Sequence, residues 1–449
     1  MKESLRESWA TRIGFVLAAV GSAVGLGNVW RFPFQVGEAG GSAFLFVYLV
    51  FVLLIGIPAM LVEFSIGRDT KRNPVGALAK YGGGLWKYIG GLFVFIAFVI
   101  LSYYSVIAGW VIRYFLDSFT GAYTAEPSEY FVSVSSGLDA ALFHAVFMLA
   151  AVVIVAYGIR RGIEVAVKVM VPAIVVLLVA LAVYAFTLEG ASEAYAFYLS
   201  PDFGEIAANW QSVLPAAAGQ AFFTLSLGMG IMITYSSYIE EDRNLGEDTG
   251  IIVAFDTGIA FIVGLVVFPI LLTVGVLPEE PGPGAIFITL AQTFGEIPLG
   301  TLIGVVFFGV FALAALSSAI SILEVVVSYA VDERGIGRRK AAFGIGGATF
   351  VLGLPVAFES TFIDLYDQLA AEVLLVLGSL LLVVLVGWFA ADRALEELSK
   401  GTDGIGMLGT FWIWLVRVPV VIVLVVSLYL GVVGYADFLT GEFAEFVFG

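Results

Sequence analysis

Eleven apolar segments, each long enough to cross a lipid bilayer, follow one another along this chain. About twenty apolar residues in a helix span the hydrocarbon core, and backbone polar groups in lipid must find partners within the spanning element. We therefore expect an all-α membrane protein of eleven transmembrane helices, folded as a single domain over residues 1–449. The expected spans are 12–36, 41–68, 87–119, 139–159, 166–188, 210–239, 250–277, 299–330, 341–358, 365–391 and 407–435.

Composition narrows the class of protein further. The chain is 60% hydrophobic and 13% charged, whereas soluble domains carry about 25% charged residues. It has no cysteine and one histidine, and no nucleotide-binding loop, metal-ligand cluster or catalytic triad, so we expect neither an enzyme nor an ATP-driven pump. A net charge of −16 excludes a nucleic-acid footprint. The lipid bilayer and a small solute are the expected partners, and the oligomeric state is left open.

Basic residues concentrate in the connections on one side of the expected spans. If the N-terminus is cytoplasmic, the inner connections hold Arg68, Arg160, Arg161, Arg338 and Lys340, whereas acidic residues dominate the outer connections. The positive-inside rule favours this orientation. Because the number of spans is odd, we expect a multi-pass protein of the plasma membrane with its N-terminus inside and its C-terminus outside.

Glycine-rich breaks interrupt two of the expected spans. Span one reads GSAVGLGN from residue 21 and span six reads TLSLGMG from residue 224. The two spans are five apart, so the second copy is inverted: repeat one covers about 10–190, repeat two about 205–400, and an extra helix about 406–436. Matching breaks in inverted halves indicate a transporter site at the bilayer midplane. Close helix packing on glycine is the alternative, and bulky side chains beside the second break argue against a channel.

Polar side chains within the expected spans need partners, because burying charge in lipid is costly. Glu63 is a natural acceptor for backbone N–H groups freed by a break, which is a structural role. Asp256 has no base nearby in sequence, so a bound cation would satisfy it; a hydrogen-bonded or protonated aspartate is the alternative. Ser317 and Ser318 supply the hard oxygens that sodium prefers, although such a pair also serves helix packing.

Three long motifs resemble the signatures of the neurotransmitter:sodium symporter family. They are GSAVGLGNVWRFPF in span one, GIPAMLVEFSIGR in span two, and GQAFFTLSLGMG with ITYSSY in span six. The resemblance extends over essentially the whole chain and is to the leucine-transporter-like amino-acid carriers of bacteria and archaea. It implies two intertwined five-helix repeats, with an amino acid and two sodium ions bound between spans one, three, six and eight. Alternating access would then couple sodium entry to amino-acid import.

The resemblance also implies two sodium sites. The first comprises the Ala23 carbonyl, Asn28, Thr224 and Asp256, together with the substrate carboxylate. The second comprises the carbonyls of Gly21, Val24 and Ala314 and the hydroxyls of Ser317 and Ser318. Relatives with asparagine at the position of Asp256 need chloride or a second acid one turn later, where this chain has Ala260. Asp256 can supply that negative charge itself, so we expect no chloride requirement.

The substrate site is implied in the same way. Gly25 stands where monoamine carriers of the family place an aspartate, which favours a substrate that carries its own carboxylate. That carboxylate would meet the N–H groups of Leu26 and Gly27 and the Tyr104 hydroxyl. The implied lining carries no charge, which favours a hydrophobic L-amino acid, and Met229 with Ala319 would admit larger or aromatic side chains. The full expected lining is Val24, Gly25, Leu26, Gly27, Ile100, Tyr104, Phe223, Thr224, Ser226, Met229, Ala319 and Ile322.

Gating residues complete the resemblance. It implies an outer gate of Arg31 with Asp367, above the aromatic lid of Tyr104 and Phe223, for which Asp364 is an alternative partner one helical turn away. The inner gate would use Arg6, Trp9, Tyr238 and Asp332. Without the resemblance, these charges read as ordinary interfacial residues. Two other functions stay open: an amino-acid sensor or channel of the same fold, and a proton-coupled carrier.

Overall fold

The computed structural model describes residues 7–38, 40–201, 203–275, 283–402 and 404–448, and the regular secondary structure of this part of the chain is entirely helical, with no β-strand. The helices of the first part are α1 (Arg12–Ala23), α2 (Phe32–Glu38), α3 (Ser42–Phe51), α4 (Ile57–Thr70), α5 (Pro74–Gly82), α6 (Lys87–Ser118), α7 (Pro127–Ser135), α8 (Gly137–Ala156), α9 (Glu164–Ala185) and α10 (Ala191–Leu199). The remaining helices are α11 (Phe203–Ala208), α12 (Trp210–Thr224), α13 (Ile231–Ser236), α14 (Leu245–Thr273), α15 (Pro283–Glu296), α16 (Gly300–Arg334), α17 (Arg338–Phe358), α18 (Thr361–Asp367), α19 (Leu375–Val384), α20 (Ala391–Ser399), α21 (Gly406–Leu415), α22 (Val421–Thr440) and α23 (Glu442–Phe448).

Short π-helical turns join or extend several of these helices. They are η1 (Gly27–Arg31), η2 (Val52–Gly56), η3 (Ile159–Ile163), η4 (Gln368–Leu374), η5 (Leu385–Phe389) and η6 (Val416–Val420). Such turns widen a helix locally and are frequent at functional sites. Two of them, η1 and η4, lie beside the candidate site described below.

Nine helical stretches of the described chain are long and apolar enough to cross a membrane, and a tenth is a pair bent by 48° between Arg12–Ala23 and Gly27–Gly37. The other expected span, 210–239, consists of α12 and α13, which have 15 and six residues and do not reach membrane length alone. Ser226, Gly228 and Gly230 separate them, with φ angles of 53°, 83° and 74°. This left-handed backbone interrupts the helix. The described residues therefore show nine spans, or ten with the bent pair, while the expected span 210–239 is divided into two shorter helices.

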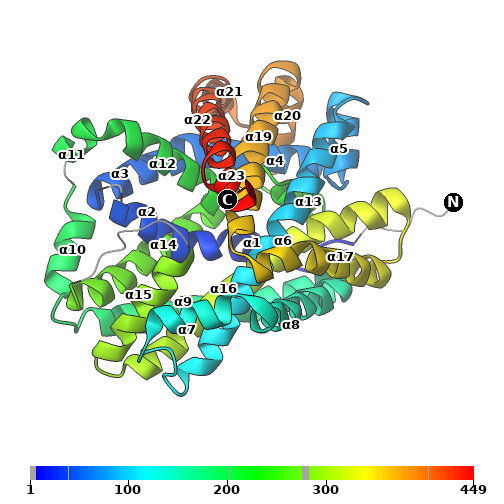
Figure 1. The fold of residues 1–449 in the computed structure, drawn as a ribbon. Coiled ribbons are helices and arrows are strands. Elements are labelled where there is room, and N and C mark those ends of the chain that lie inside the picture. The colour runs from blue at the N-terminus through cyan, green and yellow to red at the C-terminus, as the bar shows by residue number, and fades with distance from the viewer. Residues whose placement is uncertain (1–6, 39, 202, 276–282, 403, 449) are drawn as a thin grey trace.

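The break in span one lies near the centre of the fold. α1 ends at Ala23, and Val24 is extended at φ −74° and ψ 97°. α1 packs against α9, α14 and α16, and Figure 1 shows it in the middle of the molecule. Because three long helices surround α1, the break beside Val24 faces protein instead of lipid.

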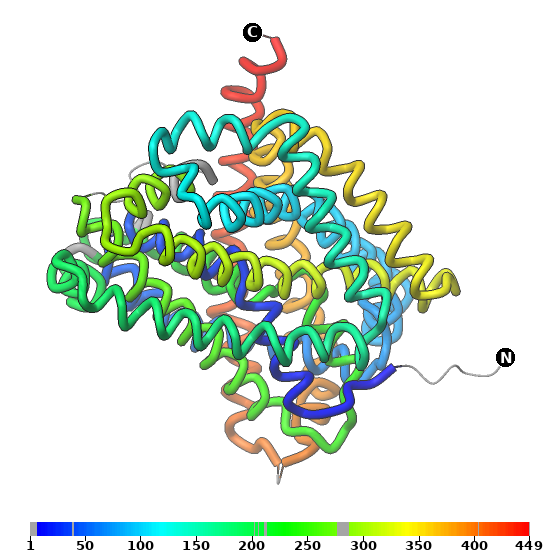
Figure 2. The backbone as a smooth tube through the Cα atoms, turned by 90° about the horizontal axis from the view of Figure 1, so that it is seen from below, coloured from blue at the N-terminus to red at the C-terminus, as the bar shows by residue number. Residues whose placement is uncertain are grey.

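Helices α6, α8 and α17 pack closely through small residues. A Cβ on Gly109 of α6 would lie 2.8 Å from the His144 backbone nitrogen of α8, and a Cβ on Gly353 of α17 would lie 2.4 Å from the Ser102 carbonyl oxygen of α6. These glycines therefore let α6, α8 and α17 approach as membrane helices commonly do. At the other end of the chain, the red helix α23 projects from the helical body in Figure 2.

Candidate functional site

The oxygens predicted for a second sodium ion converge where span one breaks beside α16. Ser317 Oγ lies 2.9 Å from the Ala314 carbonyl oxygen and 3.4 Å from that of Val24. Ser318 Oγ lies 3.4 Å from the Val24 carbonyl oxygen and 3.5 Å from that of Gly21. Each hydroxyl has one proton to donate, so acceptor oxygens outnumber donors in this buried cluster. A surplus of hard oxygens is the environment that a small cation prefers.

The residues predicted for a first sodium ion form a second buried network. The Asp256 carboxylate of α14 accepts hydrogen bonds from Asn28 Nδ2 at 2.8 Å and from Thr224 Oγ1 at 3.0 Å. Asn28 Oδ1 accepts from the Gly25 N–H at 3.2 Å. Asp256 is fully buried, and no basic side chain of the described residues forms an ion pair with it. The network therefore joins the breaks of spans one and six to one carboxylate, while Ala23, which is also predicted for this site, is the last residue of α1.

The backbone carbonyl of Ser22 also connects the break in span one with the break in span six. The Ser22 carbonyl oxygen accepts from Ser226 Oγ at 2.9 Å and from Ser318 Oγ at 2.8 Å. Ser226 reaches it because its backbone is left-handed. One peptide group of span one thus receives hydrogen bonds from span six and from α16.

Two glycines bring the backbone of span one against its neighbours. A Cβ on Gly25 would lie 2.3 Å from Ser318 Oγ and 3.0 Å from the Tyr104 hydroxyl oxygen. A Cβ on Gly27 would lie 2.9 Å from the Phe223 ring. The Leu26 N–H donates to the Tyr104 hydroxyl at 3.4 Å. Both positions therefore exclude a side chain, and the Leu26 N–H points to the Tyr104 hydroxyl.

Apart from the polar Thr224 and Ser226, the rest of the predicted substrate lining is apolar, and all of it is buried except Phe223, which is half-buried. Ile100 and Tyr104 come from α6, Ala319 and Ile322 come from α16, and Met229 comes from the break in span six. No charged side chain belongs to this lining, so it suits an apolar group. Gln220, which the sequence analysis did not single out, donates from Nε2 to the Gly27 carbonyl oxygen at 3.0 Å. Only the fold shows that this α12 side chain meets the break in span one.

Glu63 of α4 meets the break in span six. Its carboxylate accepts from the Gly228 N–H at 2.7 Å and from the Ile233 N–H at 3.4 Å. Glu63 is buried, with 2% of its surface exposed. Its two oxygens therefore satisfy donors that the interrupted helix leaves without carbonyl partners.

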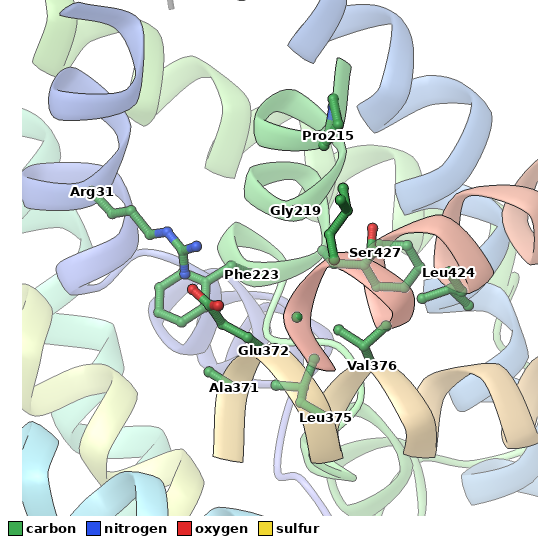
Figure 3. Close-up of a pocket in the computed structure, with 13 residues that line it drawn as sticks. Arg31, Pro215, Gly219, Phe223, Ala371, Glu372, Leu375, Val376, Leu424 and Ser427 are labelled. Atoms are coloured by element: carbon green, nitrogen blue, oxygen red, sulfur yellow. The ribbon is translucent and has the colours of Figure 1, made fainter. Parts of the chain in front are cut away.

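At the predicted outer gate, Arg31 stacks on an aromatic ring. Its guanidinium lies 4.7 Å from the centroid of the Phe223 ring. Asp367 Oδ1 instead accepts from the Tyr103 hydroxyl at 2.5 Å, and no ion pair joins it to Arg31 among the described residues. Figure 3 shows the Glu372 carboxylate pointing toward the Arg31 guanidinium beside Phe223. Glu372 was missed from sequence, although an acid within the apolar run after Gln368 was a usable signal.

Two cavities adjoin this arginine. One of about 240 Å³ lies between α12, η4 and α22, and Arg31 and Glu372 line it together with apolar side chains (Figure 3). The other, of about 190 Å³, has Arg31, Tyr104, Phe223, Asp364, Asp367 and Glu372 in its lining. The predicted gate residues and lid therefore line one cavity, and Leu26 of the broken span lines it as well.

At the predicted inner gate, Trp9 is held by the second half of span six. Its indole Nε1 donates to the Tyr235 carbonyl oxygen at 3.0 Å, and its backbone N–H donates to the Tyr238 carbonyl oxygen at 3.3 Å. The Asp332 carboxylate accepts from the Asn73 backbone N–H and from its side-chain amide, both at 3.2 Å. Arg6 lies outside the described residues. Trp9 is buried there, with 8% of its surface exposed.

A buried acid supports Tyr238. Glu324 Oε1 accepts from the Tyr238 hydroxyl at 2.8 Å, and Arg338 Nη2 lies 2.7 Å from Glu324 Oε2. Glu324 was recognisable from sequence as an acid within an apolar span, but its partners lie 86 and 14 residues away. The fold was needed to connect this pair with the inner gate.

Comparisons with known proteins agree on one family. The model described as "Sodium:neurotransmitter symporter family" matches residues 6–132 and 132–447. The chain is 33% identical to the "Uncharacterized sodium-dependent transporter YhdH" of Bacillus subtilis, over 98% of this chain and 100% of that protein. It is 34% identical to the "Uncharacterized sodium-dependent transporter MJ1319" of Methanocaldococcus jannaschii, over 94% of this chain and 90% of that protein. Among solved structures, MhsT in complex with L-phenylalanine superposes with a TM-score of 0.85 at 40% identity, covering 95% of this chain and 99% of MhsT.

Proposed function

Because the chain belongs to the sodium:neurotransmitter symporter family, we propose that it imports a hydrophobic or aromatic L-amino acid together with sodium by alternating access. The observation that carries the proposal is the meeting of three polar elements at the break in span one. They are the Val24 carbonyl, the Ser317 hydroxyl and, through Asn28, the Asp256 carboxylate. Family membership makes the chain a multi-pass membrane transporter and not an enzyme; the ligands, their number and the orientation belong to the proposal.

Two sodium ions would occupy the two oxygen clusters. The first would bind to the Ala23 carbonyl, Asn28, Thr224 and Asp256, and the second to Gly21, Val24, Ala314, Ser317 and Ser318. The hydrogen bonds within each cluster support this assignment, because groups that already lie within 3.5 Å of each other need little movement to surround an ion. The carbonyl and carboxylate oxygens that now accept hydrogen bonds from hydroxyl and amide groups would instead coordinate the sodium ion.

The substrate would lie against the same break. Its carboxylate would accept hydrogen bonds from the N–H groups of Leu26 and Gly27 and from the Tyr104 hydroxyl, and it would also contact the first sodium. The contact between the Leu26 N–H and the Tyr104 hydroxyl supports this position. A solved relative is in complex with L-phenylalanine, and the flexible thioether of Met229 beside the small Ala319 would admit a ring of that kind. We therefore propose an apolar or aromatic substrate.

Asp256 makes chloride unnecessary in this proposal. The burial of Asp256 and its lack of an ion-pair partner in the described chain support it as the negative charge that balances sodium. By the resemblance, relatives with asparagine at this position obtain that charge from chloride or from a second acid one turn later, where this chain has Ala260. Replacing chloride with gluconate should then leave uptake unchanged.

Alternating access would open one side of the site at a time. Arg31 and Asp367 would close the outer side above Tyr104 and Phe223, and the segment around Trp9 and Tyr238, with Arg6 and Asp332, would close the inner side. The free energy available is ample: at −100 mV each sodium supplies about 2.3 kcal/mol, and a tenfold gradient adds about 1.4 kcal/mol. Two ions could thus support roughly a 10⁵-fold gradient of a zwitterionic amino acid.

Uptake by proteoliposomes tests this proposal. The purified chain should accumulate labelled phenylalanine, leucine or tryptophan when sodium is outside and the interior is negative. Potassium in place of sodium should abolish accumulation. Exchange that ignores the sodium gradient would instead favour a channel or sensor, and uptake driven by a pH gradient without sodium would favour a proton-coupled carrier.

A further inference from the structure

A basic cavity lies where α8 meets η3 and the start of α17. Its volume is about 550 Å³. Four basic side chains line it, Arg161, Arg338, Arg339 and Lys340, with Glu7 as the acid and Tyr157 as the aromatic residue. The cavity is separate from the substrate and sodium clusters, since it shares no lining residue with them.

Most of the positive charge in this cavity is uncompensated. Arg161, Arg339 and Lys340 form no ion pair with any described residue and are exposed. Arg338 is occupied by Glu324, at 2.7 Å. Glu7 is occupied as well, because its Oε2 accepts from the Ile159 N–H at 2.6 Å. Three cationic side chains are therefore left to attract an anion.

The first turn of α17 adds to this attraction. Arg338, Arg339 and Lys340 open the helix, its first turn has no acidic residue, and Gly337 provides no side-chain cap. The N-terminus of a helix is its positive end and presents N–H groups without intrahelical partners. Three consecutive cations there are repelled by the positive end of the helix dipole and by one another. A bound anion would relieve this repulsion and accept the free hydrogen bonds.

Apolar side chains beside the cavity select the kind of anion. Tyr157, at its edge, is 60% exposed, and Phe343, one turn along α17 from Arg339, is 53% exposed. α8 and α17 approach closely beside them, since a Cβ on Gly346 would lie 2.1 Å from the Val152 side chain. Both helices are long and apolar enough to cross a membrane. A ligand with a phosphate headgroup and acyl chains fits this combination better than a free anion does.

We propose that this cavity binds the phosphate headgroup of an anionic membrane lipid. The phosphate contacts Arg161, Arg339 and Lys340 and the first N–H groups of α17, and the acyl chains lie along α8 and α17 beside Tyr157 and Phe343. The lipid would lie in the cytoplasmic leaflet, whose anionic lipids attract basic clusters. Only this choice of leaflet rests on the orientation given under the proposed function.

Binding of short-chain lipids to the full-length protein in detergent tests the proposal. Microscale thermophoresis would compare dioctanoyl phosphatidylglycerol, dioctanoyl phosphatidylcholine and inorganic phosphate, without substrate or a sodium gradient. We expect phosphatidylglycerol to bind more tightly than either of the other two. The triple variant Arg161→Gln, Arg339→Gln, Lys340→Gln should weaken phosphatidylglycerol binding by about a hundredfold, since each basic residue near an anionic lipid is worth about fivefold.

A matched variant controls for net charge. Arg72→Gln, Lys80→Gln, Lys87→Gln removes the same charge from exposed positions outside the cavity, and its affinity for phosphatidylglycerol should change less than about threefold. If the cavity variant unfolds, the single change Lys340→Gln should still lower affinity about fivefold. Equal losses in both triple variants, or equal binding of the two lipids, would overturn the proposal. Phosphate binding as tightly as phosphatidylglycerol would assign the cavity to a soluble anion instead. None of these outcomes depends on whether the protein transports an amino acid.

Discussion

Asn28 donates a hydrogen bond from its side-chain amide to the Asp256 carboxylate at 2.8 Å, joining the π-helical turn of span one to α14. The side-chain oxygen of Asn28 can coordinate a cation while its side-chain nitrogen donates a hydrogen bond to the Asp256 carboxylate. Asp256 is thereby oriented by two donors, Asn28 and Thr224, and keeps lone pairs free. The pair is the natural place to test the charge balance of the site.

Changing Asp256→Asn should make transport depend on chloride. The amide keeps the shape of the side chain but removes the negative charge that balances sodium. We expect uptake at low sodium to fall at least about tenfold, equivalent to about 1.4 kcal/mol, and chloride to restore part of it. Uptake would be compared in chloride and in gluconate.

A second acid should rescue that variant. Ala260 lies one helical turn after Asp256 on the buried side of α14, so Asp256→Asn with Ala260→Glu returns the charge to the site. The double variant should regain transport without chloride. Asp256→Asn that transports at the wild-type rate in gluconate would contradict the proposed role of Asp256.

Changing Gly25→Ala should abolish substrate binding. Its Cβ would stand 2.3 Å from Ser318 Oγ and 3.0 Å from the Tyr104 hydroxyl, so it must displace groups proposed to hold sodium and the carboxylate. We expect affinity to fall at least about a hundredfold, equivalent to about 2.8 kcal/mol. Gly258→Ala is the control, because a Cβ there meets nothing within 4 Å and alanine favours the helix. Scintillation-proximity binding would measure both.

Removing the carboxylate of Glu63 should destabilise the fold as well as slow transport. Glu63→Ala leaves the Gly228 and Ile233 N–H groups without their acceptor, at a cost of about 1–3 kcal/mol for each buried donor. Glu63→Gln keeps an acceptor oxygen and should be milder. Thermal unfolding in detergent should rank the wild type above Glu63→Gln and Glu63→Ala lowest, while the exposed Glu193→Gln should not change it. An unfolding temperature unaffected by Glu63→Ala would refute the structural role.

Sodium and substrate should each strengthen binding of the other. If the substrate carboxylate contacts the first sodium, linkage requires the same factor in both directions. Titrating sodium at fixed phenylalanine, and phenylalanine at fixed sodium, should therefore give matching increases in affinity. Thr224→Val removes a hydroxyl from the first cluster and should reduce this coupling. Substrate binding that ignores sodium would rule out the shared site.

Arg31→Lys should weaken the outer gate although it keeps the charge. The planar guanidinium of Arg31 lies over the Phe223 ring, and such stacking is worth about 0.5–1 kcal/mol at an exposed site. Lysine cannot stack in the same way, so we expect uptake to fall about two- to fivefold. Arg160→Lys is the control, because Arg160 is exposed and its side-chain hydrogen bonds within the described chain go to Ser8, away from the gate.

Hydropathy predicted most of the helical spans because lipid permits few other structures, and the glycines at 21–28 and 224–230 predicted where two spans break. The angles at the second break could not be read from sequence: left-handed Ser226 lies among glycines and divides the span into α12 and α13. Contacts between distant residues were also out of reach. Gln220 is an ordinary polar residue in sequence, and Glu372 stands out only as an acid within an apolar run; the neighbours of both are seen only when α12 and η4 meet span one. The ligand sets and the inverted repeat remain predictions.

Trp9 is bound to span six by its own backbone N–H and by its indole nitrogen. We therefore expect the start of span one and the end of span six to move together on that side of the molecule. A motion that frees Trp9 must break both hydrogen bonds together, whereas a motion of residues 235–238 alone would drag the N-terminal segment with it. Opening on that side is therefore expected to be an all-or-none event, and distance probes on the two segments should report two populations instead of a gradual shift.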